Sequence, residues 1–180
     1  KSTTLACLVN GLAAAGQKVA AGKITGTGAG NDRMIYHDAG AHSVIDFTDF
    51  GYPTTFKLNF AEIRALSVNM INVLADSGAD TVIVEIADGI YQDETSRLLR
   101  DQVFQESVDH VVFSAVDALG AKAGVQELQA AGLHVAAASG VMTASPLATA
   151  EAAAVLEVPV VPTFDLTNPE IVTSVLLKNA

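Results

Sequence analysis

The sequence predicts an α/β domain built on a mostly parallel sheet with helices on both of its faces. Segments of helical periodicity alternate with short apolar runs along the 180-residue chain, and this alternation is typical of βαβ crossovers. Residues 80–87 (DTVIVEIA) form an almost unbroken β-branched run, as expected of a strand covered on both faces. Half of the residues are apolar and 17% are charged, so the chain can bury a sizeable core without disulfides or metals.

Short apolar runs define the expected strands. They cover residues 18–24, 43–47, 80–87, 109–115, 133–138 and 159–161. A glycine-rich polar stretch at residues 25–32 (TGTGAGND) is expected to be a loop. We find no internal repeat, low-complexity tract or linker, so residues 1–180 are expected to form a single domain.

Periodicity and capping residues define the expected helices. The first helix has an apolar face that begins at Leu5 and is expected to stop at Gly16. The clearest helix follows Asn59, because Glu62 stands three positions later, as a capping box requires. Further helices are expected at about 118–131, at 145–156 after the Ser145-Pro146 pair, and after Asn168-Pro169.

Charge and composition narrow the possible partners and the compartment. Acidic residues outnumber basic ones 20 to 10, for a formal charge of −10, which argues against nucleic acid or an anionic membrane as the main partner. No apolar run approaches the ~20 residues that span a bilayer, and no signal-peptide pattern is visible. Since the single cysteine, Cys7, also fits a reducing compartment, we expect a cytoplasmic protein. We also expect the protein to be a homo-oligomer.

The first four residues indicate phosphate chemistry. Lys1-Ser2-Thr3-Thr4 leads straight into an amphipathic helix. The same arrangement remains when the glycine loop of the motif G-x-x-x-x-G-K-[ST] is removed. In that motif backbone N–H groups hold the phosphates, the lysine reaches the β- and γ-phosphates, and the next hydroxyl binds Mg²⁺. We therefore expect all four residues to bind a nucleotide, although the tetrapeptide alone is also typical of an ordinary helix start.

Charged residues near the ends of two of the expected strands, together with Lys1, Ser2 and Asp32, are candidates for catalysis and metal binding. Glu85 lies near the end of its strand, where ligands of open parallel sheets bind, and can hold the water shell of Mg²⁺ or orient a nucleophile. We expect Lys1, Lys23 and Glu85 to be catalytic, and Ser2, Glu85 and Asp32 to be metal contacts. The alternatives are a capping or ion-pairing carboxylate and a lysine that snorkels at the sheet end.

Chain order and local motifs resemble the dethiobiotin synthetase branch of the P-loop proteins. The segments that carry the resemblance are Lys1-Ser2-Thr3-Thr4, Lys23-Ile24-Thr25-Gly26, Val84-Glu85-Ile86-Ala87-Asp88-Gly89 and Leu119-Gly120-Ala121-Lys122. The family that includes D-amino-acid N-acyltransferases is a closer match, through residues 138–147 (ASGVMTASPL). This likeness implies a three-layer P-loop NTPase domain after a separate N-terminal domain. Ser139 and Gly140 are then expected to border the crevice and bind the nucleotide.

Three functions agree with this pattern. The first is the ATP- and Mg²⁺-binding domain of a small-molecule kinase or ligase. The second is an N-acyltransferase that holds acyl-CoA on the same scaffold, and the third is a non-catalytic nucleotide-dependent switch. ATP is the first choice because the guanine-reading Asn-Lys-x-Asp is absent, since residues 114–117 keep only its final acid; GTP and acyl-CoA stay open.

The same resemblance makes a prediction about the sheet. In P-loop domains the strand before the phosphate loop is central, and neither that strand nor the glycine part of the loop is within residues 1–180. We therefore expect either a segment that precedes Lys1 or a gap in the sheet filled by another chain, because a buried parallel sheet does not leave an internal edge unpaired.

Overall fold

The structure is a computed structural model that describes residues 1–28 and 30–177. The strands are β1 (Val19–Thr25), β2 (Ser43–Asp46), β3 (Thr81–Ile86), β4 (Val111–Ser114) and β5 (Val135–Ser139). The helices are α1 (Ser2–Ala14), α2 (Asn31–Asp38), α3 (Phe60–Asp76), α4 (Asp93–Leu98), α5 (Gln102–Glu106), α6 (Ala118–Ala130), α7 (Pro146–Val155) and α8 (Pro169–Leu176). Short 3₁₀ turns, η1 (Phe47–Phe50), η2 (Val141–Ala144) and η3 (Thr163–Thr167), complete the chain.

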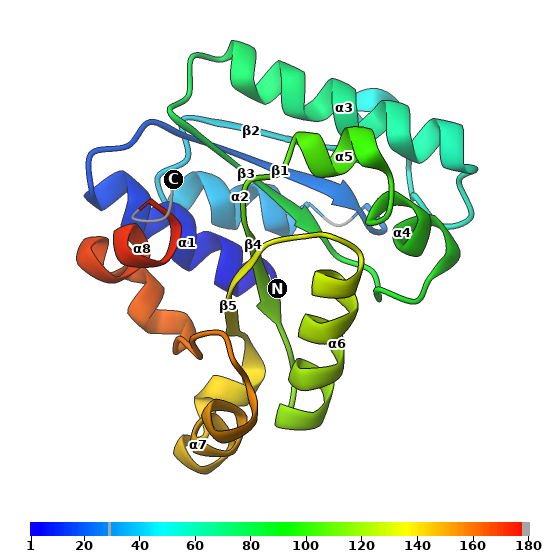
Figure 1. The fold of residues 1–180 in the computed structure, drawn as a ribbon. Helices are drawn as coiled ribbons and strands as arrows, with labels where there is room; N and C mark the ends of the chain where they lie inside the picture. The colour runs from blue at the N-terminus through cyan, green and yellow to red at the C-terminus, as the bar shows by residue number, and fades with distance from the viewer. Residues whose placement is uncertain (29, 178–180) are drawn as a thin grey trace.

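All pairings between these strands are parallel, but they form two sheets rather than one. The first has the order β2-β1-β3 and the second pairs β4 with β5 (Figure 1). Ala20 of β1 lies opposite Ser43 on one side and Val82 on the other. The expected strand at residues 159–161 forms only an isolated bridge, in which Val160 pairs with Ala138.

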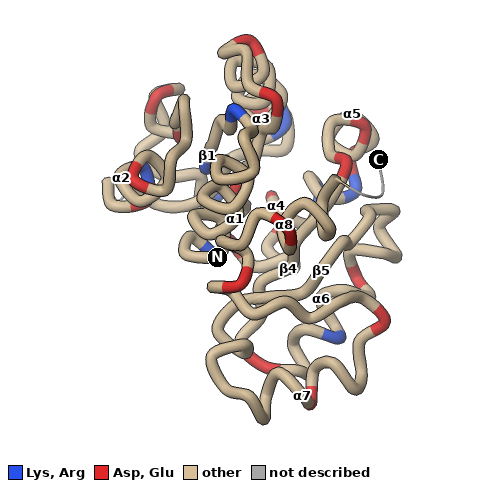
Figure 2. Tube along the Cα trace, turned by 90° about the vertical axis from the view of Figure 1, so that its left-hand side faces the viewer, with Lys and Arg blue, Asp and Glu red and all other residues tan. Residues whose placement is uncertain are grey.

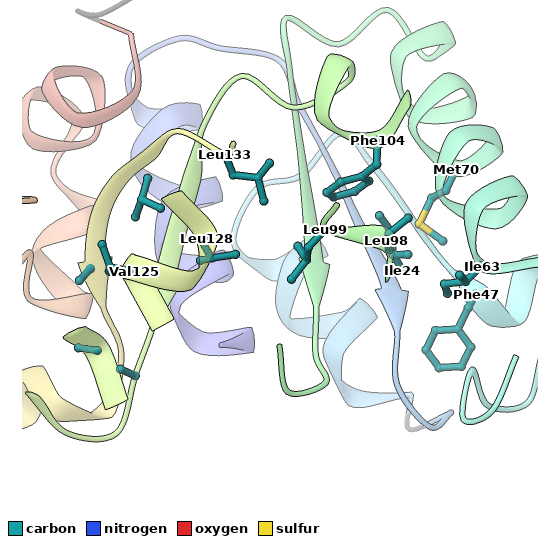
Figure 3. Packing of buried hydrophobic residues seen from close by; sticks show 14 of the residues in the cluster. Ile24, Phe47, Ile63, Met70, Leu98, Leu99, Phe104, Val125, Leu128 and Leu133 are labelled. Atoms are coloured by element: carbon teal, nitrogen blue, oxygen red, sulfur yellow. The ribbon is translucent and has the colours of Figure 1, made fainter. Parts of the chain in front are cut away.

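Helices cover both faces of the strands, so the predicted α/β class with parallel strands and helices on both faces is confirmed. One buried cluster joins the strands to α3, α4, α5 and α6, and includes Met70, Leu98, Phe104 and Leu128 (Figure 3). The other joins the opposite face to α1, α8 and η3. Each strand therefore buries side chains on both sides, which accounts for the unbroken apolar runs of the sequence.

Capping residues set the helix boundaries as the sequence predicts. Asn59 accepts a hydrogen bond from the Glu62 amide at 3.0 Å, and the Glu62 carboxylate accepts one from the Asn59 amide at 3.1 Å. Ser145 and Asn168 cap α7 and α8, each followed by proline in the first turn. Gly16 ends α1 with a φ of 88°, which only glycine adopts without strain.

The prediction of a loop over residues 25–32 is wrong at both ends. Strand β1 continues through Thr25, and Asn31 and Asp32 belong to α2; Ala29 lies outside the described residues. Helix α2 is polar and buries Tyr36 alone, so it has no apolar stripe by which the sequence could reveal it. Asp32 favours the helix start because its charge complements the positive end of the helix dipole.

Charge is dispersed over the molecule. Figure 2 shows Asp and Glu spread over helices and loops rather than gathered on one face. The helices α4 and α5, which no sequence pattern predicts, are short and carry part of this charge. Among residues 1–28 and 30–177, no helix combines the length and the apolar character needed to cross a membrane.

Candidate functional site

The start of α1 and the end of β3 meet through a serine and a glutamate. The Ser2 hydroxyl lies 3.2 Å from Oε1 and 3.1 Å from Oε2 of Glu85. Ser2 is partly exposed, whereas Glu85 is 6% exposed. The sequence brings them together because parallel strands end at one edge of a sheet, and α1 begins at that same edge.

Tyr36 of α2 also contacts the Glu85 carboxylate, and no sequence pattern predicts this contact. Its hydroxyl donates to Oε2 of Glu85, and its ring is 1% exposed. Burial and the negative charge of Glu85 raise the pKa of the Tyr36 hydroxyl well above its usual 10.0. Tyr36 therefore stays protonated and acts as a fixed hydrogen-bond donor. No local motif identifies Tyr36, because its contact depends on a helix that the sequence pattern did not predict.

The N-terminus of α1 presents donors suited to an anion. Lys1 is the N-cap residue and makes no side-chain cap. The first intrahelical bond runs from the Leu5 amide to the Lys1 carbonyl at 2.9 Å, so the amides of Ser2, Thr3 and Thr4 precede the helical ladder. The first turn holds no acidic side chain. Phosphate groups bind at such helix starts, where the amides and the helix dipole both favour negative charge.

Lys1 and Thr25 fix the turn that follows β3. Lys1 is exposed, and its Nζ donates to the carbonyl of Ala87. The Thr25 hydroxyl, fully buried at the end of β1, accepts from the Ala87 amide at 2.9 Å and the Asp88 amide at 3.4 Å. The only sequence signal for Thr25 is its position at the end of an apolar run. These contacts hold the turn beside the Ser2–Glu85 pair.

The structure places Lys23 and Asp32 in a pair of their own. Lys23 lies opposite Glu85 in the register of β1 and β3, so both side chains share one face of the sheet. Its Nζ, however, forms an ion pair with Asp32 of α2. The side chains of Lys23 and Asp32 are 13% and 19% exposed. Lys23 therefore links the sheet to α2 instead of facing open solvent.

Ser139 and Gly140 lie at the end of β5, in a network that includes two threonines. Ser139 is fully buried, and its hydroxyl lies 3.1 Å from that of Thr163. The Gly140 amide donates to Thr163 at 3.1 Å, and Thr143 donates to the Gly140 carbonyl at 2.7 Å. A Cβ at Gly140 would lie 2.7 Å from the Ala115 carbonyl oxygen, and φ is 102°. This loop is therefore shaped by packing against the end of β4.

Ser2 and Glu85 provide oxygen atoms of the kind that Mg²⁺ prefers. Mg²⁺ in proteins commonly takes one or two carboxylates, with waters and substrate phosphates completing its shell. Asp32 forms an ion pair with Lys23. Among residues 1–28 and 30–177, no group of three or more His, Cys, Asp or Glu side chains could hold a metal. Ser2 and Glu85 thus fit an ion that is bound mainly through phosphate and water.

Comparison with known structures identifies the fold. The chain is similar to the signal recognition particle receptor FtsY from Elizabethkingia anophelis, crystallised in complex with GDP, at a TM-score of 0.59 and 19% identity over 99% of this chain. The chain has a P-loop NTPase fold.

A second structure of the same receptor matches this P-loop fold at a TM-score of 0.55 and 19% identity over 98% of this chain. The chain spans about 60% of the length of these FtsY chains. No family model matches the sequence, and no curated protein matches it.

Proposed function

We propose that this chain is the nucleotide-binding domain of an ATP- and Mg²⁺-dependent enzyme that acts on a small molecule as a kinase or ligase. The observation that carries the proposal is the hydrogen-bonded pair of Ser2 and Glu85, at the N-terminus of a helix whose first amides are uncapped by any side chain. The P-loop fold supports it. In the proposal, the amides of Ser2, Thr3 and Thr4 hold phosphate oxygens, and Lys1 neutralises their charge.

Ser2 and Glu85 would hold Mg²⁺, which when bound neutralises the charge that builds up on the transferred phosphoryl group. The Ser2 hydroxyl would bind the ion directly and Glu85 would hold one of its waters. Tyr36 keeps the Glu85 carboxylate in a fixed orientation. Positioning and electrostatic stabilisation would supply most of the catalysis.

ATP is the proposed nucleotide, and GTP is the competing one. The FtsY structure is described with GDP. In this chain, however, Asp117 caps α6, accepting from the Gly120 amide at 2.6 Å, and the residues before it are Ser114, Ala115 and Val116 instead of Asn-Lys-x. A guanine-reading site needs that signature, so a site without it favours ATP.

Calorimetric titration with ATP, GTP and acetyl-CoA, each with and without Mg²⁺, tests the proposal. We expect ATP to bind with Mg²⁺-dependent affinity. Ser2→Ala is expected to weaken the Mg²⁺ dependence. Glu85→Gln is expected to lower turnover far more than nucleotide affinity. Glu151 is an exposed carboxylate on α7. The matched control Glu151→Gln should change neither turnover nor nucleotide affinity.

The outcomes separate the competing functions. Absence of ATP and GTP binding at millimolar concentrations contradicts the proposal. Product formation that requires a CoA thioester favours the N-acyltransferase instead, and hydrolysis without any acceptor favours a nucleotide-dependent switch. A homo-oligomer and an additional N-terminal domain belong to the same proposal, and light scattering and intact mass of the natural protein measure them.

A further inference from the structure

Two histidines face each other at the amino ends of β4 and β5. His110 directly precedes β4 and His134 directly precedes β5, one residue before the Val111–Val135 pair of the parallel register. Their Nδ1 atoms are 2.8 Å apart. The ring centroids are 5.0 Å apart, and the ring planes are inclined at 61°. The candidate nucleotide site, in contrast, is built on the carboxyl ends of strands, so this histidine pair is a separate feature.

The backbone holds the two rings together and leaves them open to solvent. The Val111 amide donates to the His134 carbonyl at 2.8 Å, so the two chain segments are hydrogen-bonded at the position of the rings. His110 is partly exposed and His134 is exposed. Within residues 1–28 and 30–177, the contact between the two Nδ1 atoms is the only side-chain hydrogen bond that either ring makes. A small ion can therefore reach the pair without any movement of the main chain.

The contact between the rings holds one proton that a cation can replace. A hydrogen bond between two ring nitrogens needs one N–H and one lone pair, so a single proton lies between the two Nδ1 atoms. When each neutral ring carries its own proton on Nε2, both Nδ1 atoms present lone pairs toward the same point. Neutral imidazole that binds through Nδ1 or Nε2 is the commonest metal ligand among the side chains.

The distance between the nitrogens is close to the value that a shared ion requires. Two imidazole nitrogens on a tetrahedral Zn²⁺, each about 2.0–2.1 Å from the ion, lie about 3.3–3.4 Å apart. The observed 2.8 Å therefore needs to open by about half an ångström, which rotation of the exposed His134 ring provides. Asp109 is exposed directly before His110, and the formal charge of −10 also favours a cation.

We propose that His110 and His134 form a binding site for a divalent transition-metal ion, with Zn²⁺ as the expected occupant. Imidazole nitrogens suit Zn²⁺, Cu²⁺ and Ni²⁺, whereas Mg²⁺ prefers oxygen ligands, so this site differs in chemistry from the Ser2–Glu85 pair. Since no third His, Cys, Asp or Glu of the described residues joins the two rings, water fills the remaining positions. The ion is therefore exchangeable, unlike one in a closed structural site with four protein ligands.

Calorimetric titration of the protein with Zn²⁺, in the absence of nucleotide, tests the proposal. We expect one ion per chain, and excess Mg²⁺ should not compete with it. His110→Ala and His134→Ala should each weaken Zn²⁺ binding by at least about tenfold, because even outer-shell partners of a metal contribute 10–100-fold. The control His42→Ala, which removes another exposed histidine, should leave the affinity unchanged. In a crystal soaked in Zn²⁺, the anomalous signal should lie about 2.0–2.1 Å from both Nδ1 atoms.

Three results overturn the inference. They are Zn²⁺ affinity that survives either alanine substitution, an ion found only elsewhere in the soaked crystal, and no Zn²⁺ binding at millimolar concentrations. If alanine at either position lowers Tm without metal, His110→Gln and His134→Gln repeat the test with a polar side chain in place. None of these measurements involves a nucleotide, so the inference can fail while the proposed function holds, and the reverse is also true.

Discussion

Replacing Tyr36 with phenylalanine removes one hydroxyl from Glu85 and leaves the aromatic ring in place. The ring is 1% exposed and Glu85 is 6% exposed, so water cannot readily replace the lost donor. A hydrogen bond to a charged group contributes about 1.5–3 kcal/mol to the free energy of unfolding. In a domain of this size each kcal/mol corresponds to about 2–4 °C in Tm, so we expect Tyr36→Phe to lower Tm by roughly 3–12 °C.

The pH dependence of this effect has a definite sign. The pKa of the Tyr36 hydroxyl is raised above 10.0 in the folded protein, so folding favours its protonated form. The stability that this contributes is fully present below pH 10 and is lost as the pH rises beyond the unfolded value. The difference in stability between wild type and Tyr36→Phe should therefore shrink as the pH rises above 10.

Urea denaturation followed by circular dichroism measures both effects. Tyr91→Phe is the matched control, because Tyr91 is 70% exposed, and this substitution should change the free energy of unfolding by less than about 0.5 kcal/mol. A double-mutant cycle of Tyr36→Phe with Glu85→Gln isolates the interaction between the two side chains. The reasoning is refuted if Tyr36→Phe costs no more than Tyr91→Phe, or if its cost is unchanged through the alkaline range.

Two further substitutions test how the helices are held. Gly11→Ala places a Cβ 2.1 Å from the Leu166 carbonyl oxygen, so it should push α1 away from η3 and lower the free energy of unfolding, measured by urea denaturation, by about 1–3 kcal/mol. The control Gly30→Ala meets open space and should be neutral or slightly stabilising. Equal effects of the two substitutions would contradict the close approach of α1 to η3. Asn59→Ala removes the cap of α3 and should cost about 1 kcal/mol, whereas Asn59→Asp should keep most of the stability, and a neutral Asn59→Ala would show that the capping box is dispensable.

The features that the sequence predicts well are those determined by neighbouring residues. The capping box of Asn59 and Glu62, the Ser145-Pro146 start and the long apolar run around β3 all depend on local contacts, and the structure has each of them. Helix α2 was missed because it follows glycines and buries only Tyr36. The assignment of β3 and β4 to separate sheets could not be predicted, because strand pairing depends on residues that lie far apart in the sequence.

The candidate site shows the same division. The motif at Ser2 and the acid at Glu85 were predicted from strand and helix ends, and the structure places them 3.1 Å apart. Their roles in binding and catalysis remain predictions. Tyr36 and Thr25 could not be assigned, because their contacts with Glu85 and the following turn depend on how α2 and β1 lie beside β3.

The last prediction concerns Lys23, which was predicted to be catalytic and which the structure pairs with Asp32. With side chains only 13% and 19% exposed, either charge left alone would be poorly solvated, so Lys23→Met and Asp32→Asn should each cost about 3 kcal/mol, the lower end of the range for a broken buried pair. The double variant Lys23→Met/Asp32→Leu leaves no unpaired charge and should recover most of that loss in urea denaturation.

Activity distinguishes an ion pair that only supports the fold from a lysine that acts on substrate. If Lys23 only joins β1 to α2, the double variant should recover nucleotide binding and turnover together with stability. If Lys23 neutralises a phosphate or a substrate carboxylate, the double variant should fold like wild type and still lose turnover. A double variant no more stable than the single ones would contradict the pairing itself, because the cost would then come from lost packing around Lys23 and not from an unpaired charge.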